Sequence, residues 1–306
     1  MKKVLVMSLL ALVVVTMSSC LHVKFGENGW SLINKAGRSN NTPTQVHQVN
    51  EVTQMEAFDE IDVAGPFNVI LEQGQASTVR VEGTVDQLGN MTIYVKDGDL
   101  VIDMKEDMVD ASKFFDGLRV FVSSPMVKSI EVDGSGSLTA PKALAVNDMN
   151  LEVSGSGDIT LAQLTCKGLD IEVAGSGDVM TGPVQADAVK NSIAGSGGIE
   201  LASVVCNAVK NSIAGSGDIE LASVVCKEVK NSIAGSGGIE LTSVVCNAVK
   251  NSIAGSGDVR LNNLNVDHVS TSIAGSGDVI LRGTVGSHSE EIAGSGRVDV
   301  SGIKSK

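Results

Sequence analysis

The segment "NSIAGSGDIELASVVCKEVK", residues 211–230, is nearly repeated in the twenty residues before it and again in the twenty after it. The Gly-Ser-Gly triplet within it marks every copy. Triplets begin at Gly134, Gly155, Gly175, Gly195, Gly215, Gly235, Gly255, Gly275 and Gly294. Their spacing is 21 residues once, 20 residues six times and then 19 residues. A fixed period near twenty predicts a solenoid, in which each repeat buries its apolar residues against the next copy.

The apolar residues of the repeat recur at fixed distances from the triplet. In the central copy these positions are occupied by Ile219, Leu221, Val224, Cys226, Val229 and Ile233. They alternate with polar residues in short groups, and the alternation breaks at the triplet, near Ala222 and near Lys227. Alternation with period two is typical of β-strands. The pattern predicts an all-β protein: a single-stranded, three-faced parallel β-helix with about 20 residues per rung, a rung being one turn of the chain.

The region before the repeat also reads as strands. "MTIYVKDGDLVIDMK", residues 91–105, predicts a hairpin that turns at Asp97-Gly98. A short helix is expected only near residues 110–115. "IDVAGPF" at residues 61–67 aligns with "IEVAGSG" at residues 171–177, so an early rung is expected to carry the inserted hairpin. We therefore predict an N-terminal β lobe, or cap, over residues 51–125 and the β-helix over residues 126–306.

The first twenty residues have the features of an export signal. Lys2 and Lys3 precede an apolar run from Val4 to Val15, and Cys20 follows the small residues "SS". This pattern resembles the bacterial lipobox, which implies a signal peptide over residues 1–19, lipid attachment at Cys20 and a tether over residues 20–50. The expected partner is then a membrane, reached through the N-terminal lipid anchor, and the expected location is the outer membrane, facing the periplasm or the cell surface.

Composition limits the partners further. The formal net charge of −13 argues against nucleic acid as a partner, because phosphate contacts need an excess of Lys and Arg. Every aromatic residue precedes residue 126. The aromatic side chains of the N-terminal lobe, including Phe67 and Phe121, either cap the open end of the core or form a binding surface.

Two inward-facing columns of residues carry polar or reactive groups. The amides of Asn191, Asn211, Asn231 and Asn251 fall where other repeats have apolar residues, so we expect a buried, mutually hydrogen-bonded ladder. Cys206, Cys226 and Cys246 occupy consecutive rungs, and we expect them to be buried. Whether these thiols are free or bridged stays open at this point.

Metal binding has weak support. The "GSGD" segments partly match calcium-binding RTX repeats, but glycine replaces the aspartate at Gly198 and Gly238, which favours a structural role and leaves calcium dependence open. His268 and His288 follow their triplets at the same distance and are weak candidates for a metal site. No cofactor is expected. No Ser/His/Asp arrangement, phosphate loop or other catalytic motif is recognisable, so no catalytic residue is assigned.

"FDEIDVAGPFNVILEQG" (58–74), "LRVFVSSPMVKSIEVDGSGSL" (118–138) and the "GSGDI" repeats together resemble the DUF2807 family, the auto-transporter adhesin head or GIN domain found in lipoproteins of Bacteroidetes. The resemblance covers roughly residues 57–300 and implies a role in adhesion.

These observations favour a non-enzymatic envelope lipoprotein that presents a rigid β-helix to an unknown protein or glycan ligand. Candidate contact residues are Tyr94, Phe114, Phe115, Glu200, Glu220 and Glu240. A periplasmic structural or signalling module is the first alternative. A polysaccharide-active enzyme is the second, because parallel β-helices include such enzymes.

Overall fold

A computed structural model describes residues 21–26, 29–34, 45–106 and 108–306 of the 306-residue chain. Residues 1–19 and Cys20, the predicted signal peptide and lipidation site, lie outside the described residues. The chain forms two compact units, residues 1–42 and residues 43–306. In the first, strands β1 (Leu21–Gly26) and β2 (Gly29–Asn34) pair antiparallel. In the part that the structure describes, no helix is both long and apolar enough to span a membrane.

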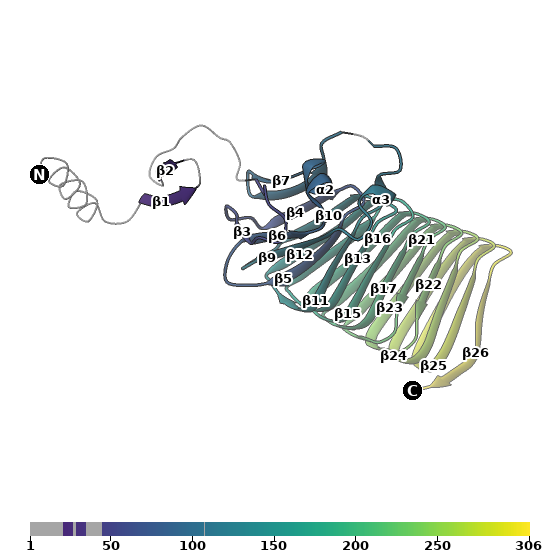
Figure 1. Ribbon diagram of the computed structural model, residues 1–306. Helices are drawn as coiled ribbons and strands as arrows, with labels where there is room; N and C mark the ends of the chain where they lie inside the picture. The colour runs from purple at the N-terminus through teal and green to yellow at the C-terminus, as the bar shows by residue number, and fades with distance from the viewer. Residues whose placement is uncertain (1–20, 27–28, 35–44, 107) are drawn as a thin grey trace, which may run out of the picture. The chain divides into compact units, whose positions relative to one another are not determined.

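The second unit is a parallel β-helix (Figure 1), which confirms the predicted fold class. Residues twenty apart are register partners on neighbouring strands, for example Lys210 and Lys230. The strands of the repeat are β10 (Ser129–Gly134), β11 (Ser137–Ala145), β12 (Asp148–Gly155), β13 (Asp158–Thr165), β14 (Gly168–Val173), β15 (Asp178–Gln185), β16 (Ala188–Gly195), β17 (Gly198–Val205), β18 (Ala208–Gly215), β19 (Asp218–Leu221), β20 (Val224–Val225), β21 (Glu228–Gly235), β22 (Gly238–Leu241), β23 (Val244–Gly255), β24 (Asp258–Gly275), β25 (Asp278–Gly294) and β26 (Arg297–Ser305).

The three segments of a rung are most distinct in the central repeat, where bends separate β19, β20 and β21. In later rungs the strand pairing continues through the bends, so β24 spans all three segments. The inward positions are buried as predicted: Ile219, Leu221, Val224 and Val229 are all 0% exposed. Apolar burial on every face of the rung is therefore what holds neighbouring rungs together.

The Gly-Ser-Gly triplets stack at one corner of the β-helix. Gly215 has φ +147°, a conformation that L side chains rarely adopt, and a Cβ on it would lie 2.3 Å from the carbonyl oxygen of Gly195. The amide of Ser216 donates to the same oxygen at 2.8 Å. The corner requires glycine because backbones of successive rungs touch there.

The cap is an insertion within the first rung. β4 (Glu60–Ala64) and β5 (Asn68–Gln73) form that rung and pair parallel with β10 and β11. β8 (Asp99–Met104) and β9 (Arg119–Ser124) add to the other side of β4 and β5, also parallel. β7 (Met91–Lys96) and β6 (Thr78–Glu82) then pair antiparallel with β8 and β9, and β3 (Thr53–Gln54) pairs with β6. The parallel stack thus ends in antiparallel strands, and residues 43–306 form one unit.

The local predictions for the cap hold in part. β7 and β8 form the expected hairpin, and Asp97 (φ 55°) and Gly98 (φ 96°) both have the positive φ of a type I′ turn. Helix α3 (Ala111–Phe114) lies in the expected position. Helix α2 (Val85–Gly89) was not expected, although a reciprocal capping box between Thr84 and Gln87 marks its start.

Candidate binding groove

A column of lysines runs along one face of the β-helix. Strand register aligns Asp170, Lys190, Lys210, Lys230 and Lys250 on β14, β16, β18, β21 and β23. Their chain neighbours on both sides, the valine and asparagine columns, point into the core. Because side chains alternate across a strand, all the lysine side chains must project outward together.

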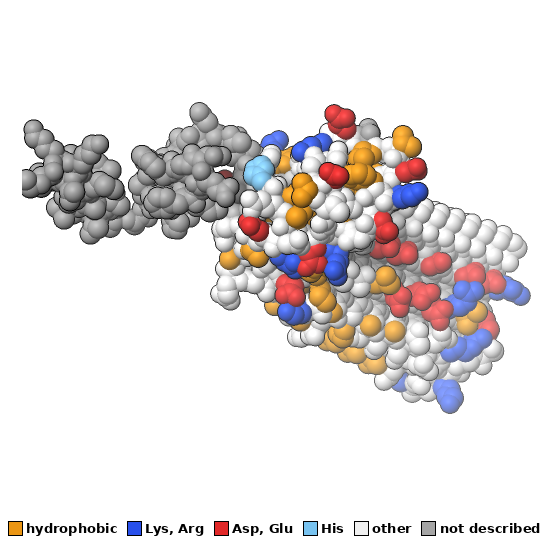
Figure 2. Space-filling view, in the orientation of Figure 1, with side chains coloured by type: hydrophobic (Ala, Val, Ile, Leu, Met, Phe, Trp, Pro, Cys, Tyr) orange, Lys and Arg blue, Asp and Glu red, His pale blue; other side chains and the backbone are white. Residues whose placement is uncertain are grey.

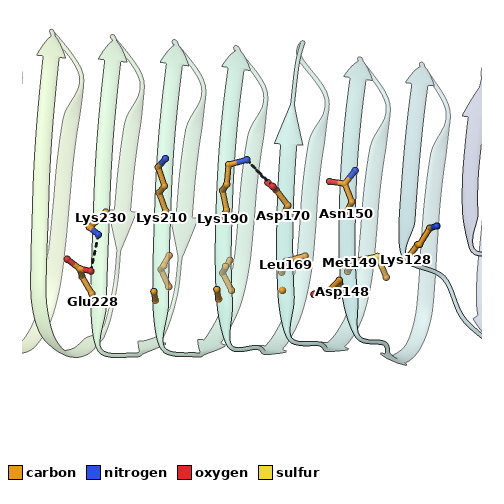
Figure 3. A pocket seen from close by; sticks show the side chains of 15 residues that line it. Lys128, Asp148, Met149, Asn150, Leu169, Asp170, Lys190, Lys210, Glu228 and Lys230 are labelled. Atoms are coloured by element: carbon orange, nitrogen blue, oxygen red, sulfur yellow. Dashed lines mark hydrogen bonds and ion pairs between the residues drawn. The ribbon is translucent and has the colours of Figure 1, made fainter.

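A groove of about 620 Å³ lies beside this column. Its floor exists because small residues, Gly168, Ala188 and Ala208, occupy the outward position two residues before the column. Asp148 and Glu228 stand at the same position at the two ends of the floor. Figure 3 shows Asn150, Asp170, Lys190, Lys210 and Lys230 standing in a row along the groove. The groove is therefore a trough with an apolar floor and a polar wall.

The charges along the wall are paired except at its centre. Lys190 Nζ lies 2.9 Å from Asp170 Oδ2, and Lys230 Nζ lies 3.0 Å from Glu228 Oε2. Lys250 also reaches Glu228, at 3.5 Å. The hydrogen bond that Lys190 donates to Asp170 raises the pKa of Lys190, and the hydrogen bond that Lys230 donates to Glu228 lowers the pKa of Glu228. Within the described ranges, Lys210 makes no ion pair.

The exposed ammonium group of Lys210, on the wall above an apolar floor, favours one class of ligand. It can bind a carboxylate, sulfate or phosphate, while the methylene groups of the neighbouring lysines and the floor alanines contact apolar parts of the same molecule. A volume of about 620 Å³ lies in the range of small-ligand sites. The groove geometry therefore suits the binding of an anionic molecule.

The predicted glutamates lie on a different face. Glu200, Glu220 and Glu240 are in register on β17, β19 and β22, next to Arg260 on β24. A shallow hollow of about 180 Å³ includes Glu200 and Glu220. These strands pair with none of the cap strands. Figure 2 shows acidic side chains gathered on the side of the β-helix that faces the viewer. The six candidate contact residues therefore do not form one site.

Of the three aromatic candidates, one belongs to the core and two are half-buried. Phe115 is 1% exposed, and its ring packs edge-on against buried Phe67, with 4.9 Å between centroids. The prediction that Phe115 contributes to a contact surface is therefore wrong, because this side chain closes the end of the core. Phe114 packs on Phe115 and is half-buried, as is Tyr94. The guanidinium of Arg80 covers the ring of Phe121 at 4.1 Å.

A cluster of carboxylates occupies the outward face near the cap. Burial raises the pKa of Asp62 to about 6, with further contributions from Asp99, Asp133 and Asp103. Burial also raises the pKa values of Asp99 and Glu131. One oxygen each of Asp62 and Asp99 is buried without a hydrogen-bond partner. The cluster is an electrostatic strain on the fold, and none of these residues lines the groove.

The two histidines are not register partners. His268 pairs in register with Ser287, to which its Nδ1 is hydrogen-bonded at 2.7 Å, whereas His288 pairs with Val269. The 19-residue rung shifts the register by one. No group of three or more metal-ligating side chains is close enough to hold an ion in the ranges that the structure covers.

The aspartates of the "GSGD" segments make hydrogen bonds to the next rung. Asp178 Oδ1 accepts from the amide of Gly198 at 2.7 Å, and Asp218 Oδ1 accepts from Gly238 at 2.8 Å. A Cβ on Gly198 would lie 2.9 Å from Asp178 Oδ1. The same bond forms where Asp follows Asp, since the amide of Asp178 donates to Asp158 Oδ1 at 3.0 Å, so these aspartates have a structural role at the turns but do not require glycine on the next rung.

The sequence pattern alone does not reveal the groove, because exposed lysines at a regular spacing usually form a solvated face. The available signal was the run of Gly and Ala two positions before the lysines, which leaves the floor open. Glu228 interrupts this run of small residues. Only the strand register shows that this glutamate lies beside two lysines and pairs with both.

Two kinds of comparison place the chain among known proteins. The model of the DUF2807 family, described as "Putative auto-transporter adhesin, head GIN domain", matches residues 57–243 and 232–306. No curated protein matches the chain.

Solved structures with a similar fold come from two species of Parabacteroides. A "putative adhesin" of Parabacteroides distasonis is 21% identical, with 84% of this chain and 95% of that chain covered and a TM-score of 0.63. A "putative lipid binding protein" of the same species is 24% identical, with coverage of 85% and 97% and a TM-score of 0.59. A "putative adhesin" of Parabacteroides merdae is 18% identical, with coverage of 85% and 96% and a TM-score of 0.62. At these identities the likeness establishes the fold alone.

Proposed function

Because the chain belongs to the DUF2807 family of auto-transporter adhesin head domains, we propose that it is a non-enzymatic binding protein of the bacterial cell envelope. The family and its structural neighbours are described as adhesins or lipid-binding proteins and not as enzymes. The observation that carries the proposal is the groove beside the lysine column, with Lys210 unpaired at its centre among the described residues. A rigid groove that presents the unpaired ammonium group of Lys210 is suited to binding an anionic ligand.

The proposal includes an anchor and a location. Cys20 is the proposed lipidation site, and residues 20–50 would tether the β-helix to the outer membrane. The support is the sequence pattern around Cys20 and the adhesin-like description of the family. The proposed ligand is a protein or glycan that presents acidic groups, because Lys210 lacks a carboxylate partner among the described residues.

Protease shaving of intact cells tests the location. An epitope placed after Lys306 should be lost when protease is added, while a periplasmic control protein survives. [³H]palmitate labelling should be lost in Cys20→Ala. Protection of the epitope until the outer membrane is permeabilised would remove the adhesion function and favour the periplasmic structural or signalling module.

Charge reversal tests the groove. The purified chain should bind an array of acidic glycans or host-cell surfaces, and Lys210→Glu should weaken binding by roughly 10-fold or more, as for loss of one charged contact. Glu220→Lys, which reverses a charge on the glutamate face, is the matched control and should bind normally. Equal binding by the parent and Lys210→Glu would exclude the groove, and an effect confined to Glu220→Lys would transfer the function to the glutamate column.

A further inference from the structure

Three thiols are stacked on consecutive rungs at the bend before the lysine face. Cys206, Cys226 and Cys246 follow Val205, Val225 and Val245, which are register partners. All three are free cysteines. Cys246 is buried, but Cys206 and Cys226 are only half-buried, which corrects the expectation that the whole column is buried. A solute can therefore reach the column from its Cys206 end.

The three side chains adopt the same orientation. Each thiol donates to the carbonyl oxygen two residues further along the chain: Cys206 to Ala208 at 3.3 Å, Cys226 to Glu228 at 3.4 Å and Cys246 to Ala248 at 3.4 Å. Since rungs are related by a simple stacking translation, equal orientation makes the distance between neighbouring sulfurs equal to the strand spacing, roughly 4.8 Å.

This spacing suits a metal ion between two sulfurs. A disulfide needs sulfurs about 2.05 Å apart, so bridging would require both side chains to rotate out of their present hydrogen bonds. Two metal–thiolate bonds of about 2.3 Å placed end to end span about 4.6 Å, close to the strand spacing. Thiolate ligands select soft ions, and Cu(I) is the soft ion that readily accepts two sulfurs in a line.

We propose that Cys206, Cys226 and Cys246 form a Cu(I) site in which the ion bridges the sulfurs of adjacent rungs and Cys226 is the ligand shared by both possible pairs. Each Cu⁺ that binds replaces the protons of two thiols, giving a Cu(SR)₂⁻ unit and two released protons with no change of oxidation state. A linear site needs only two ligands, so it does not require the larger groups of ligands that the described residues lack.

The geometry explains why no other cysteine of the described chain takes part. Cys166 occupies the same column, but Ala186 stands on the rung between it and Cys206. The gap of two rungs is about twice the strand spacing and too long for one ion to bridge. At the other end, Val266 is the register partner of Cys246 and closes the column with an apolar side chain.

Competition with a coloured chelator tests the proposal. The full chain carrying Cys20→Ser, reduced and without oxygen, is titrated with Cu(I) in the presence of bathocuproine disulfonate, and a thiolate-to-copper charge-transfer band is followed in the near ultraviolet. We expect about one equivalent of Cu(I) to be withdrawn from the chelator. Cys226→Ser removes a direct ligand of the ion. It should therefore weaken binding by more than the roughly 10- to 100-fold lost when a residue that only orients a ligand is changed.

Further variants separate the site from general thiol affinity. Cys206→Ser keeps the pair Cys226 and Cys246 and should still bind one ion, whereas Cys166→Ser should bind like the parent. Cys226→Ala repeats the test with a residue that Ala186 shows to fit the column. The proposal is overturned if the parent leaves the copper with the chelator, if folded Cys226→Ser and Cys226→Ala bind like the parent, or if Cys166→Ser loses as much affinity as they do.

Discussion

At the residue scale, the buried asparagines form the most specific contacts of the β-helix. Asn191 Nδ2 donates to Asn211 Oδ1 at 2.8 Å, Asn211 to Asn231 at 2.8 Å and Asn231 to Asn251 at 2.9 Å. Asn251 ends the series by donating to Thr271 Oγ1 at 3.2 Å. The predicted ladder is therefore confirmed. A polar column inside an apolar core stabilises only one alignment of neighbouring rungs, because a slip leaves amides unpaired.

Removing one amide from the middle of the ladder should be costly. Asn211→Ala leaves an amide hydrogen of Asn191 and the carbonyl oxygen of Asn231 buried without partners, so we expect the free energy of unfolding to fall by about 2–4 kcal/mol. Urea unfolding followed by circular dichroism measures this. Ser212→Ala, at the adjacent outward position, should change stability by less than about 0.5 kcal/mol. A loss no larger in Asn211→Ala than in Ser212→Ala would show that the ladder does not stabilise the fold.

Asp62 predicts a pH dependence of stability. Its pKa rises from 3.8 to about 6 on folding, chiefly through burial, so the folded state binds the proton more tightly than the unfolded state. Stability must then fall as the pH rises from about 4 to about 6. Asp62→Asn should be more stable than the parent above pH 6, by about 1 kcal/mol once solvent screening of a half-buried group is allowed for, and this advantage should disappear at about pH 4.

The measurement is urea unfolding at a series of pH values. Asp99 and Glu131 have raised pKa values of the same origin, so Asp62→Asn should keep a weaker slope of the same sign. Glu172→Gln, on the same face two strands beyond Glu131, is the matched control and should retain the full slope. A variant with an unchanged slope would mean that Asp62 ionises normally in the folded protein.

The sequence predicted the ladder but not the strained carboxylates, and the difference has a physical cause. The asparagine column replaces apolar residues at a position whose inward direction follows from period two alone. Asp62 is outward by the same rule, and its burial depends on β8, which lies on β4 only because of an insertion of more than forty residues. Long-range contacts of this kind leave no periodic signal.

At the element scale, the cap closes the core with aromatic side chains. Phe67 leaves the first rung and meets Phe115, which follows α3, so two segments far apart in sequence seal one end. The sequence placed the hairpin β7–β8 and the short helix correctly, because their turn and helix signals are local. The sequence could not show that β8 and β9 extend the parallel stack, because their pairing with β4 and β5 joins segments far apart in the chain.

Truncating the sealing residue tests this description of the cap. Phe115→Ala should reduce the free energy of unfolding by about 3–5 kcal/mol, because it removes a fully buried ring and leaves a cavity. Tyr94→Ala, which truncates a half-buried aromatic of the same cap, should cost clearly less. Thermal unfolding monitored by near-ultraviolet circular dichroism would compare the two, and equal losses would show that Phe115 is not the main seal.

At the scale of the β-helix, each rung contacts only the rungs beside it, so a whole rung should be removable. Deleting residues 211–230 joins Lys210 to Asn231 and preserves the local sequence "AVKNSIAG". We expect a folded protein whose far-ultraviolet circular dichroism per residue matches that of the parent. Its m-value for urea unfolding should fall in proportion to the buried surface that is removed. Size-exclusion chromatography would verify a compact monomer or an unchanged oligomer.

Half a rung should not be removable. Deleting residues 211–220 joins Lys210 to Leu221 and shifts every following residue by half a turn, so inward and outward columns no longer match between rungs. This variant should fail to fold or should aggregate. Normal folding of the half-rung deletion, or failure of the whole-rung deletion, would contradict the nearest-neighbour description.

The near identity of two rungs has a consequence for inheritance. Residues 191–210 and 231–250 differ only at Ala202 and Thr242, so a crossover between their coding sequences at equivalent codons would leave an intact repeat at the junction. An exchange between them stays in frame and removes or adds forty residues, which are two complete rungs with the same corner, ladder and thiols. Such exchanges would lengthen or shorten the β-helix in steps of two complete rungs. No product would contain a partial rung, so each product keeps the inward and outward columns in register.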